Sequence, residues 1–273
     1  MKQDDAKQLA EQGLRQLNEA LRQGKSEALE RYLTVMARFH KYSFHNSLMI
    51  ALQNAQASLV AGFRKWHQLG RHVRKGEKGI AIFAPITCRR KTQNDEDGEV
   101  AVATLRGFRI VHVFDISQTE GDDLPQFSQA LGDPGQYIAQ LESLIRHQGI
   151  ALQYDALPFG VKGESHEGRI VIQADLLPAE HLAILAHELG HELLHKGARR
   201  HETTKTVRET EAEAVAFVVC RACGVDTSTR SADYIQLYRG DTDTLAESLA
   251  FIQKTAAHIL AHLLHTPSQE VAV

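Results

Sequence analysis

The chain has 273 residues, of which 43% are hydrophobic and 24% charged, a composition that permits one large or two ordinary domains and excludes a disordered tail. Lys and Arg number 31 and Asp and Glu 34, so the net charge of −3 excludes a uniformly basic or acidic protein. Only three cysteines, no apolar leader and no apolar run of about 18 residues together predict a cytoplasmic protein that enters no membrane.

The first part of the chain predicts three helices followed by a long hairpin. Apolar residues recur at helical spacing in residues 4–23 and 26–38, and residues 44–57 have the same character. Two apolar runs, 79–86 and 100–114, flank a polar stretch. Such a pattern is typical of two strands joined by a hairpin loop.

Turn-forming residues are concentrated at 117–134, which we interpret as a linker between two domains, 1–116 and 135–273. Helices and strands are mixed on both sides of this linker, so the predicted fold class is α+β. After the linker we expect strands at 150–154 and 168–173 and helices at about 136–148, 178–196, 206–223 and 242–264.

The basic residues are concentrated before the linker. Residues 25–91 contain thirteen Lys and Arg but three acidic residues, and aromatic residues are interleaved with the cations. Cations that follow a backbone and rings that stack on unpaired bases are typical of single-stranded DNA binding. The alternative is a basic surface over core aromatics. The candidate DNA contacts are Arg38, Lys41, Tyr42, Phe44, Asn46, Arg64, Lys65, Trp66, Arg71, Arg74, Lys75 and Lys78.

A His-Glu-x-x-His motif in the second half is the strongest chemical signal. His187 and His191 lie one helical turn apart, where two imidazoles can bind one metal ion, and Glu188 beside them is the candidate general base. An overlapping motif runs from His191 to His195, and both cannot supply the primary pair. We favour the first motif because the small Gly190 suits a buried helix with a close neighbour. His195 is then a packed histidine or one that supports a ligand.

Catalytic zinc usually takes three protein ligands and a water, so a third ligand is required. The helix Val207–Cys220 offers Glu209, Glu211 and Glu213. Glu209 and Glu213 share one face, whereas Glu211 points about 200° away at about 100° per residue. We predict Glu209 as the ligand and Glu213 as the carboxylate that orients a ligating histidine. A surface role fits Glu211 best, although periodicity alone does not decide between Glu209 and Glu211.

This set of residues predicts zinc-dependent peptide hydrolysis. Glu188 would accept a proton from the attacking water and return it to the leaving amine. Tyr234 and His201 are the candidates for oxyanion or substrate contacts. The predicted strand Gly168–Gln173 is either an edge strand that pairs with an extended substrate or a buried strand.

Several segments resemble known families. Tyr42–Asn46, Val60–Trp66, Leu69–Ile82 and Val113–Gly121 resemble the N-terminal single-stranded-DNA-binding domain of ArdC-type antirestriction proteins. His187–His191 and Glu209–Phe217 resemble the zincin-like zinc metallopeptidase domain of ArdC and, more distantly, of ImmA/IrrE-type proteins.

The resemblance implies a protein of mobile elements that binds single-stranded DNA, carries Zn²⁺ and protects incoming DNA from restriction, with an unknown protein substrate. Related peptidases have Glu-x-x-x-Asp on the third-ligand helix with the first Glu on the metal, which agrees with Glu209, whereas Glu213 replaces the Asp. Two alternatives remain. One is a non-catalytic DNA-binding protein with a structural or vestigial metal site, and the other is an ImmA-like protease that cleaves a repressor.

Overall fold

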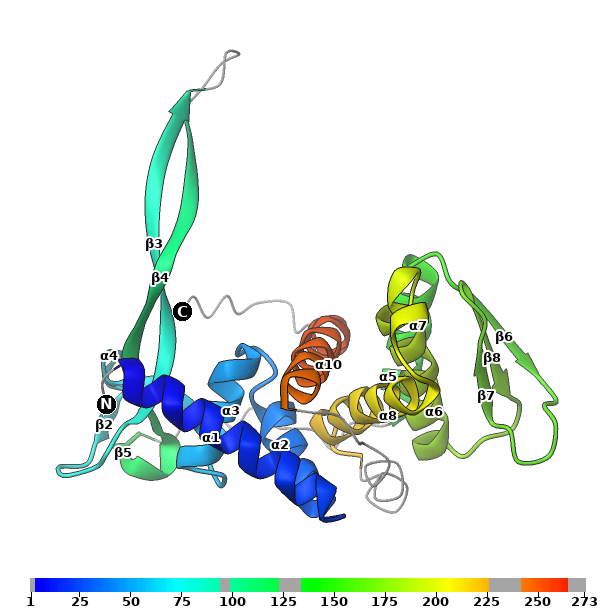
Figure 1. Ribbon diagram of the computed structural model, residues 1–273, viewed down its shortest axis with the longest axis horizontal. Helices are drawn as coiled ribbons and strands as arrows, with labels where there is room; N and C mark the ends of the chain where they lie inside the picture. Colours follow the sequence, from blue (N-terminus) through cyan, green and yellow to red (C-terminus); the bar gives the residue numbers. More distant parts are fainter. Residues whose placement is uncertain (1–2, 94–98, 123–133, 226–241, 265–273) are drawn as a thin grey trace. The chain divides into compact units, whose positions relative to one another are not determined.

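A computed structural model of the chain describes residues 3–93, 99–122, 134–225 and 242–264 (Figure 1). Helices and small sheets occur in both halves of the chain, which confirms the predicted α+β class. Among the described helices, none combines the length and the apolarity that crossing a membrane requires.

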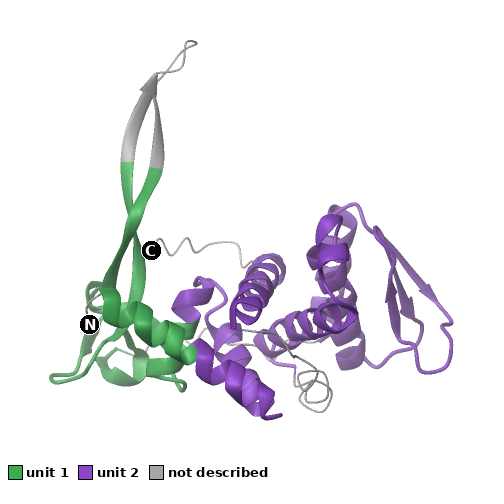
Figure 2. Cartoon of the chain, in the orientation of Figure 1, with its two compact units in different colours: residues 1–13, 48–123 green, residues 14–47, 124–273 purple. Residues whose placement is uncertain are grey.

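The chain divides into two compact units (Figure 2). Unit 1 comprises residues 1–13 and 48–123, and unit 2 comprises residues 14–47 and 124–273. Residues 14–47 are therefore part of the C-terminal unit, whereas the sequence placed them in a first domain ending at residue 116. The spacing of apolar residues predicts helices here but not the partner on which they pack. Most of the predicted linker, residues 123–133, lies outside the described residues.

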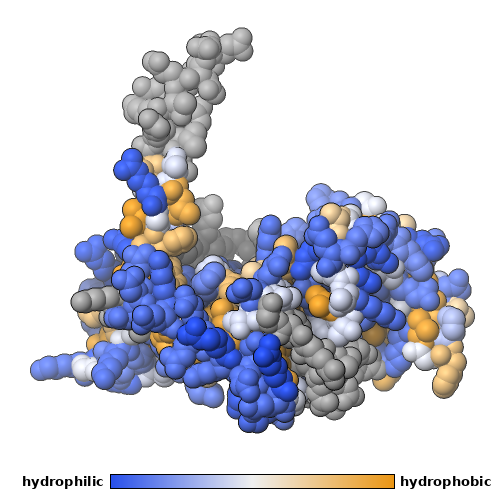
Figure 3. All heavy atoms as spheres, viewed as in Figure 1, coloured by the Kyte–Doolittle hydropathy of each residue, from blue (hydrophilic) through white to orange (hydrophobic). Residues whose placement is uncertain are grey.

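Unit 1 is built around a long antiparallel hairpin. Strand β3 (Ile80–Gln93) pairs with β4 (Glu99–Asp115), and β1 (Val60–Gly62) adds to the other edge of β4. The predicted hairpin is confirmed and is longer than expected at its distal end. Exposed apolar side chains lie on its described part, where hydrophobic residues reach the surface (Figure 3). They include Ile86, Leu105 and Phe108.

Short elements complete unit 1, and the sequence did not predict them. Helix α4 (Phe63–Gln68) follows β1, and β2 (Arg71–Val73) pairs with β5 (Thr119–Gly121) after the 3₁₀ turn η1 (Ile116–Gln118). The strands β1, β2 and β5 have three residues each, too few for alternation to be recognised.

Asp115 joins three segments of unit 1. Its buried carboxylate accepts hydrogen bonds from the backbone N–H groups of Ser58 at 2.8 Å, Leu59 at 3.1 Å and Ser117 at 3.0 Å. The Gln118 side chain accepts from the Asp115 N–H in return and so completes a capping box. Burial would raise the pKa of Asp115, but these hydrogen bonds lower it below its ordinary value.

Replacing Asp115 by Ala should lower the free energy of unfolding by about 3 kcal/mol at pH 7, because several buried donors lose a charged acceptor. Since the pKa of Asp115 is lowered in the folded state, its stabilising effect is complete above the unfolded pKa of about 3.9 and disappears as the pH falls through the folded value. Denaturant unfolding of both proteins at pH 7 and below pH 4 measures this. A difference that stays the same at both pH values would contradict the assignment.

Unit 2 contains a three-stranded sheet of order β6-β8-β7. Strand β8 (Arg169–Gln173) pairs in parallel with β6 (Ala151–Asp155) and antiparallel with β7 (Gly163–Ser165). Both edges of β8 are therefore occupied and Ile170 and Ile172 are fully buried, so the prediction of an edge strand at 168–173 is wrong and the buried alternative is right. The two edges of the sheet belong to β6 and to β7, which is three residues long.

The predicted helices of unit 2 are confirmed to within a few residues. They are α2 (Glu27–Arg38), α5 (Pro134–His147), α6 (Pro178–Leu194), α8 (Lys205–Ala222) and α10 (Thr242–Leu263), with a short α7 (Ala198–Glu202) between α6 and α8. Helix α8 packs against α6, α2 and α10, and all its residues from Thr210 to Cys220 are buried except Glu213. At Gly190 of α6, an added Cβ would lie 3.3 Å from the Ala212 Cα of α8, so the glycine permits the two helices to approach closely.

Candidate metal centre

Helices α6 and α8 bring three metal-binding side chains together. His187 and His191 lie one turn apart on α6, and their Nε2 atoms are 3.1 Å apart. Helix α8 contributes Glu209, whose Oε2 lies 3.6 Å from the Nε2 atom of each histidine. Within the described residues, these three form a group whose donor atoms all lie within 4.8 Å of one another.

The triangle of donors has the dimensions of a metal site. Bonds of about 2.0 to 2.2 Å in tetrahedral geometry place ligand atoms roughly 3.3 to 3.6 Å apart. Glu209 lies 3.6 Å from each histidine, at the upper end of this range, and the two histidine nitrogens, 3.1 Å apart, are slightly closer than its lower end. Two imidazole nitrogens and one carboxylate oxygen are donors suited to a first-row divalent ion, so the residues present fit a divalent metal.

His187 has carboxylates on both sides of its ring. Its Nδ1 lies 3.1 Å from Glu213 Oε2, while its Nε2 faces Glu209. Burial lowers the pKa of His187, but the hydrogen bonds of the two glutamates outweigh it and raise the pKa to about 10. The same contacts with His187 and His191 hold the pKa of Glu209 well below its usual range.

Glu188 lies between the donor group and strand β7. Its side chain is buried, and burial raises its pKa to about 7, an effect that His187 opposes and the carboxylates of Glu209 and Glu164 strengthen. A Cβ added at Gly163 on β7 would lie 2.7 Å from the Glu188 Oε1. The absence of a side chain at Gly163 therefore leaves the room that the Glu188 carboxylate occupies.

The overlapping motif has a different environment. Glu192, its glutamate, is 2% exposed and accepts hydrogen bonds from the Ser165 Oγ and the Gly168 N–H, both at 2.7 Å. This glutamate ties the β7–β8 turn to α6. His195 is 1% exposed, and its Nδ1 faces the Nδ1 of His191 at 3.2 Å. His195 is therefore packed behind a candidate ligand.

The environment of Glu211 differs most clearly from the prediction made from the sequence. It is 1% exposed, whereas a surface role was expected. Its carboxylate lies 2.9 Å from His195 Nε2 and accepts two hydrogen bonds of 2.8 Å from Arg199. Burial would raise the pKa of Glu211, but the hydrogen bonds of His195, Arg199 and Ser248 lower it. These partners lie on other helices, so no local pattern on α8 could indicate them.

Two residues, Tyr234 and His201, were predicted as candidates for oxyanion or substrate contact. Tyr234 lies outside the described residues. His201 is exposed on the short helix α7.

The predicted DNA contacts divide between the two units. Arg38, Lys41, Tyr42, Phe44 and Asn46 belong to unit 2. The other seven belong to unit 1 and are Arg64, Lys65, Trp66, Arg71, Arg74, Lys75 and Lys78.

Some of these side chains have structural roles. Trp66 is fully buried and donates from Nε1 to the Phe114 carbonyl at 2.8 Å, and Phe44 is 6% exposed. Neither ring offers a face to a base, so for these two the alternative of core aromatics is right. Arg71 donates to the carbonyl of Asp122, and Arg74 donates to the Ser117 carbonyl at 2.6 Å.

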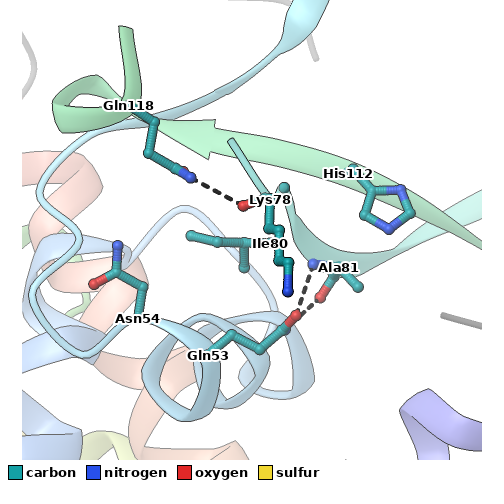
Figure 4. A pocket seen from close by; sticks show the side chains of 8 residues that line it. Gln53, Asn54, Lys78, Ile80, Ala81, His112 and Gln118 are labelled. Carbon is teal, nitrogen blue, oxygen red and sulfur yellow. Dashed lines mark hydrogen bonds between the residues drawn. The ribbon is translucent and has the colours of Figure 1, made fainter. Parts of the chain in front are cut away.

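A cavity of about 430 Å³ lies in unit 1 (Figure 4). Gln53 fixes one wall, because its amide both donates to and accepts from the backbone of Ala81 at 2.9 Å. Gln118 donates to the Lys78 carbonyl at 2.9 Å on another wall. The lining side chains include Asn54, Lys78 and His112, and none of the lining residues is acidic. Gln53 and Gln118 had no signal in the sequence, because each acts through distant backbone groups.

A helical His-Glu-x-x-His motif that meets a glutamate of a second helix, beside a small sheet, defines a metallopeptidase-like domain. Residues 148–220 match the IrrE N-terminal-like domain family of M78 peptidases, and residues 5–114 match the N-terminal domain of the anti-restriction factor ArdC. The chain thus combines an ArdC-like N-terminal domain with an IrrE-like peptidase domain.

Two known proteins are similar to the chain over most of its length. The metal-free crystal structure of the antirestriction ArdC protein from plasmid R388 is 23% identical over 82% of this chain and 85% of its own, with a TM-score of 0.51, and so shares the fold. An uncharacterized pXO2 protein of Bacillus anthracis is 25% identical over 82% of this chain. The chain matches 46% of that relative's length, or about half.

Binding of Zn²⁺ should strengthen as the pH rises. Because the pKa of His187 is raised to about 10, the ion must displace a proton, and affinity should increase about tenfold per pH unit between about pH 6 and pH 9 for one displaced proton. Competition with a chelator of known affinity measures this. An affinity independent of pH would show that His187 does not lose a proton to the ion.

Proposed function

We propose that this chain is an antirestriction protein that binds single-stranded DNA and carries a zinc-dependent endopeptidase site. The observation that supports this most is the convergence of His187, His191 and Glu209 with the buried Glu188 beside them. We further propose two functional domains, 1–116 and 135–273, joined by residues 117–134, although residues 14–47 of the first pack within unit 2. The free thiols of the three cysteines suit a reducing compartment, and we assign the protein to the cytoplasm.

Zinc would be held by the Nε2 atoms of His187 and His191 and by Glu209. A zinc ion supplies Lewis acidity, which polarises a peptide carbonyl and makes water acidic enough to attack near neutral pH. Glu188 has a different task. Its pKa of about 7 suits an exchange of protons at neutral pH, so it accepts the proton of the attacking water and returns it to the leaving amine.

The substrate would be an extended peptide. Strand β7 forms an edge of its sheet and lies against α6 next to Glu188. An extended segment can add to such an edge through main-chain hydrogen bonds. This would bring a scissile carbonyl close to Glu188, and it replaces the interpretation that gave this role to β8.

Single-stranded DNA would bind unit 1 through exposed cations and the cavity of Figure 4. Arg64, Lys75 and Lys78 are exposed, and Lys78 also lines the cavity. Lysines can follow phosphates, while the amide of Asn54 and the ring of His112 can bind the edge or face of a base. The unburied cations support electrostatic binding without sequence preference.

Two alternatives differ in the use of the metal centre. A non-catalytic protein would protect DNA by coating it, with a structural metal. Structural zinc sites are usually closed by four protein ligands, whereas three donors converge among the described residues, which favours catalysis. An ImmA-like protease that cleaves a repressor would share the chemistry and differ in its target.

Glu188→Gln should retain Zn²⁺ within about threefold and lose peptidase activity by about 100-fold or more, because the amide cannot accept the water proton. Cells that express the parent or the variant and receive unmodified DNA provide the test. Fragments of the substrate, measured by quantitative mass spectrometry, should appear with the parent alone, and DNA protection should disappear with the variant.

Glu202→Gln, an exposed carboxylate on α7, is the matched control and should behave as the parent does. Full protection by the Glu188 variant would favour the non-catalytic alternative. Cleavage of a repressor without protection of DNA would favour the ImmA-like one.

Lys78→Gln should weaken oligonucleotide binding several-fold and reduce the magnitude of the salt slope by about 0.7, the value for one lost phosphate contact on a single strand. Lys25→Gln, an exposed lysine of unit 2, is the control. Fluorescence anisotropy of a labelled oligonucleotide over a range of salt concentrations measures both quantities. Equal salt slopes for both variants would show that Lys78 does not contact the DNA.

Trp66 supplies an independent check on DNA binding. Because its ring is fully buried, its fluorescence should change little when an oligonucleotide binds. Strong quenching at saturation would show that Trp66 leaves the core and stacks on a base.

A further inference from the structure

The candidate ligand His191 is connected to a buried row of side chains. Its Nδ1 lies 3.2 Å from the Nδ1 of His195, and the Nε2 of His195 lies 2.9 Å from the Oε2 of Glu211. Arg199 donates two hydrogen bonds of 2.8 Å to the same carboxylate. His195 and Glu211 are each 1% exposed, so bulk water does not compete for these contacts.

The order of atoms allows one arrangement of protons when Nε2 of His191 binds a metal. A ligating Nε2 carries no proton, so the proton of neutral His191 is on Nδ1 and points to His195. The Nδ1 of His195 must then accept, which puts its own proton on Nε2. That N–H points to the carboxylate of Glu211, which can only accept. Each hydrogen-bond donor in the row thus faces an acceptor.

The far end of the row is fixed by helix α10. The guanidinium carbon of Arg199 lies 3.8 Å from the centre of the Phe251 ring, and Ser248 hydrogen-bonds Glu211. Both partners are on α10, which lies beyond the residues that match the peptidase family. The carboxylate therefore has four contacts from three directions and cannot rotate freely.

We propose that His195, Glu211 and Arg199 are positioning residues that hold the ring and the tautomer of His191 for metal binding. The inference rests on the proposed metal centre and adds residues that touch neither metal nor substrate. It assigns different supports to the two histidines. His187 has a carboxylate directly behind it, in Glu213, whereas His191 reaches a carboxylate through a second imidazole.

The test is the affinity of full-length variants for Zn²⁺, measured by competition with a chelator. His195→Leu removes both the acceptor and the donor, and zinc affinity should fall about 10- to 100-fold, the range for lost support of a ligand. His195→Gln can accept at Oε1 and donate from Nε2, and it should restore affinity to within about threefold of the parent. The visible absorption of the Co²⁺-loaded proteins should change with Leu and not with Gln.

Ile259→Ala, a buried change on α10 outside the row, controls for general loss of stability and should keep parent affinity. If His195→Leu does not fold, Glu211→Gln replaces it, and weaker zinc binding is again expected. Parent affinity in a folded Leu or Glu211 variant would overturn the positioning role alone. Failure of the parent to bind one equivalent of Zn²⁺ would overturn the metal centre, and the inference with it.

Discussion

The close approach of α6 and α8 is the constraint on which the metal centre depends. A histidine pair on one helix supplies two donors at a spacing that the helix itself determines. The third donor must come from another element, and a residue at position 190 larger than glycine would push α8 away, because its Cβ would lie 3.3 Å from Ala212 Cα. Burial of α8 between α6, α2 and α10 then fixes the direction in which Glu209 points.

Charges in this region are tolerated because most of them are paired. An unpaired ionised group in a buried site costs several kcal/mol, whereas hydrogen-bonded pairs recover much of that cost. Glu209 and Glu211 have imidazole partners, and their pKa values are lowered. Glu188 differs, since burial dominates and raises its pKa to about 7. The carboxylate with the raised pKa is the one whose proposed role is proton transfer, as expected where environments separate acid and base functions.

Local patterns determined what could be predicted from the sequence. The long helices, the hairpin and the histidine pair follow from periodicity and spacing, and Glu209 followed from the face it shares with Glu213. The burial of Glu211 could not be predicted, because its partners His195 and Arg199 come from other parts of the chain. The burial of Trp66 could not be predicted for the same reason, because its indole N–H donates to the carbonyl of Phe114, which is distant in the sequence. Composition showed where the basic residues are concentrated but could not show that they divide between two units.

The central claim is that one zinc ion binds between α6 and α8, and zinc-edge X-ray absorption of the zinc-loaded protein tests it most directly. The account predicts two imidazole nitrogens at about 2.0 Å and oxygen ligands at about 2.0 to 2.2 Å, with no sulfur. Loss of one imidazole is expected in His191→Ala but not in His195→Gln. A sulfur shell at about 2.3 Å would place the ion at a cysteine, Cys88, Cys220 or Cys223, and an unchanged spectrum of His191→Ala would also contradict the account.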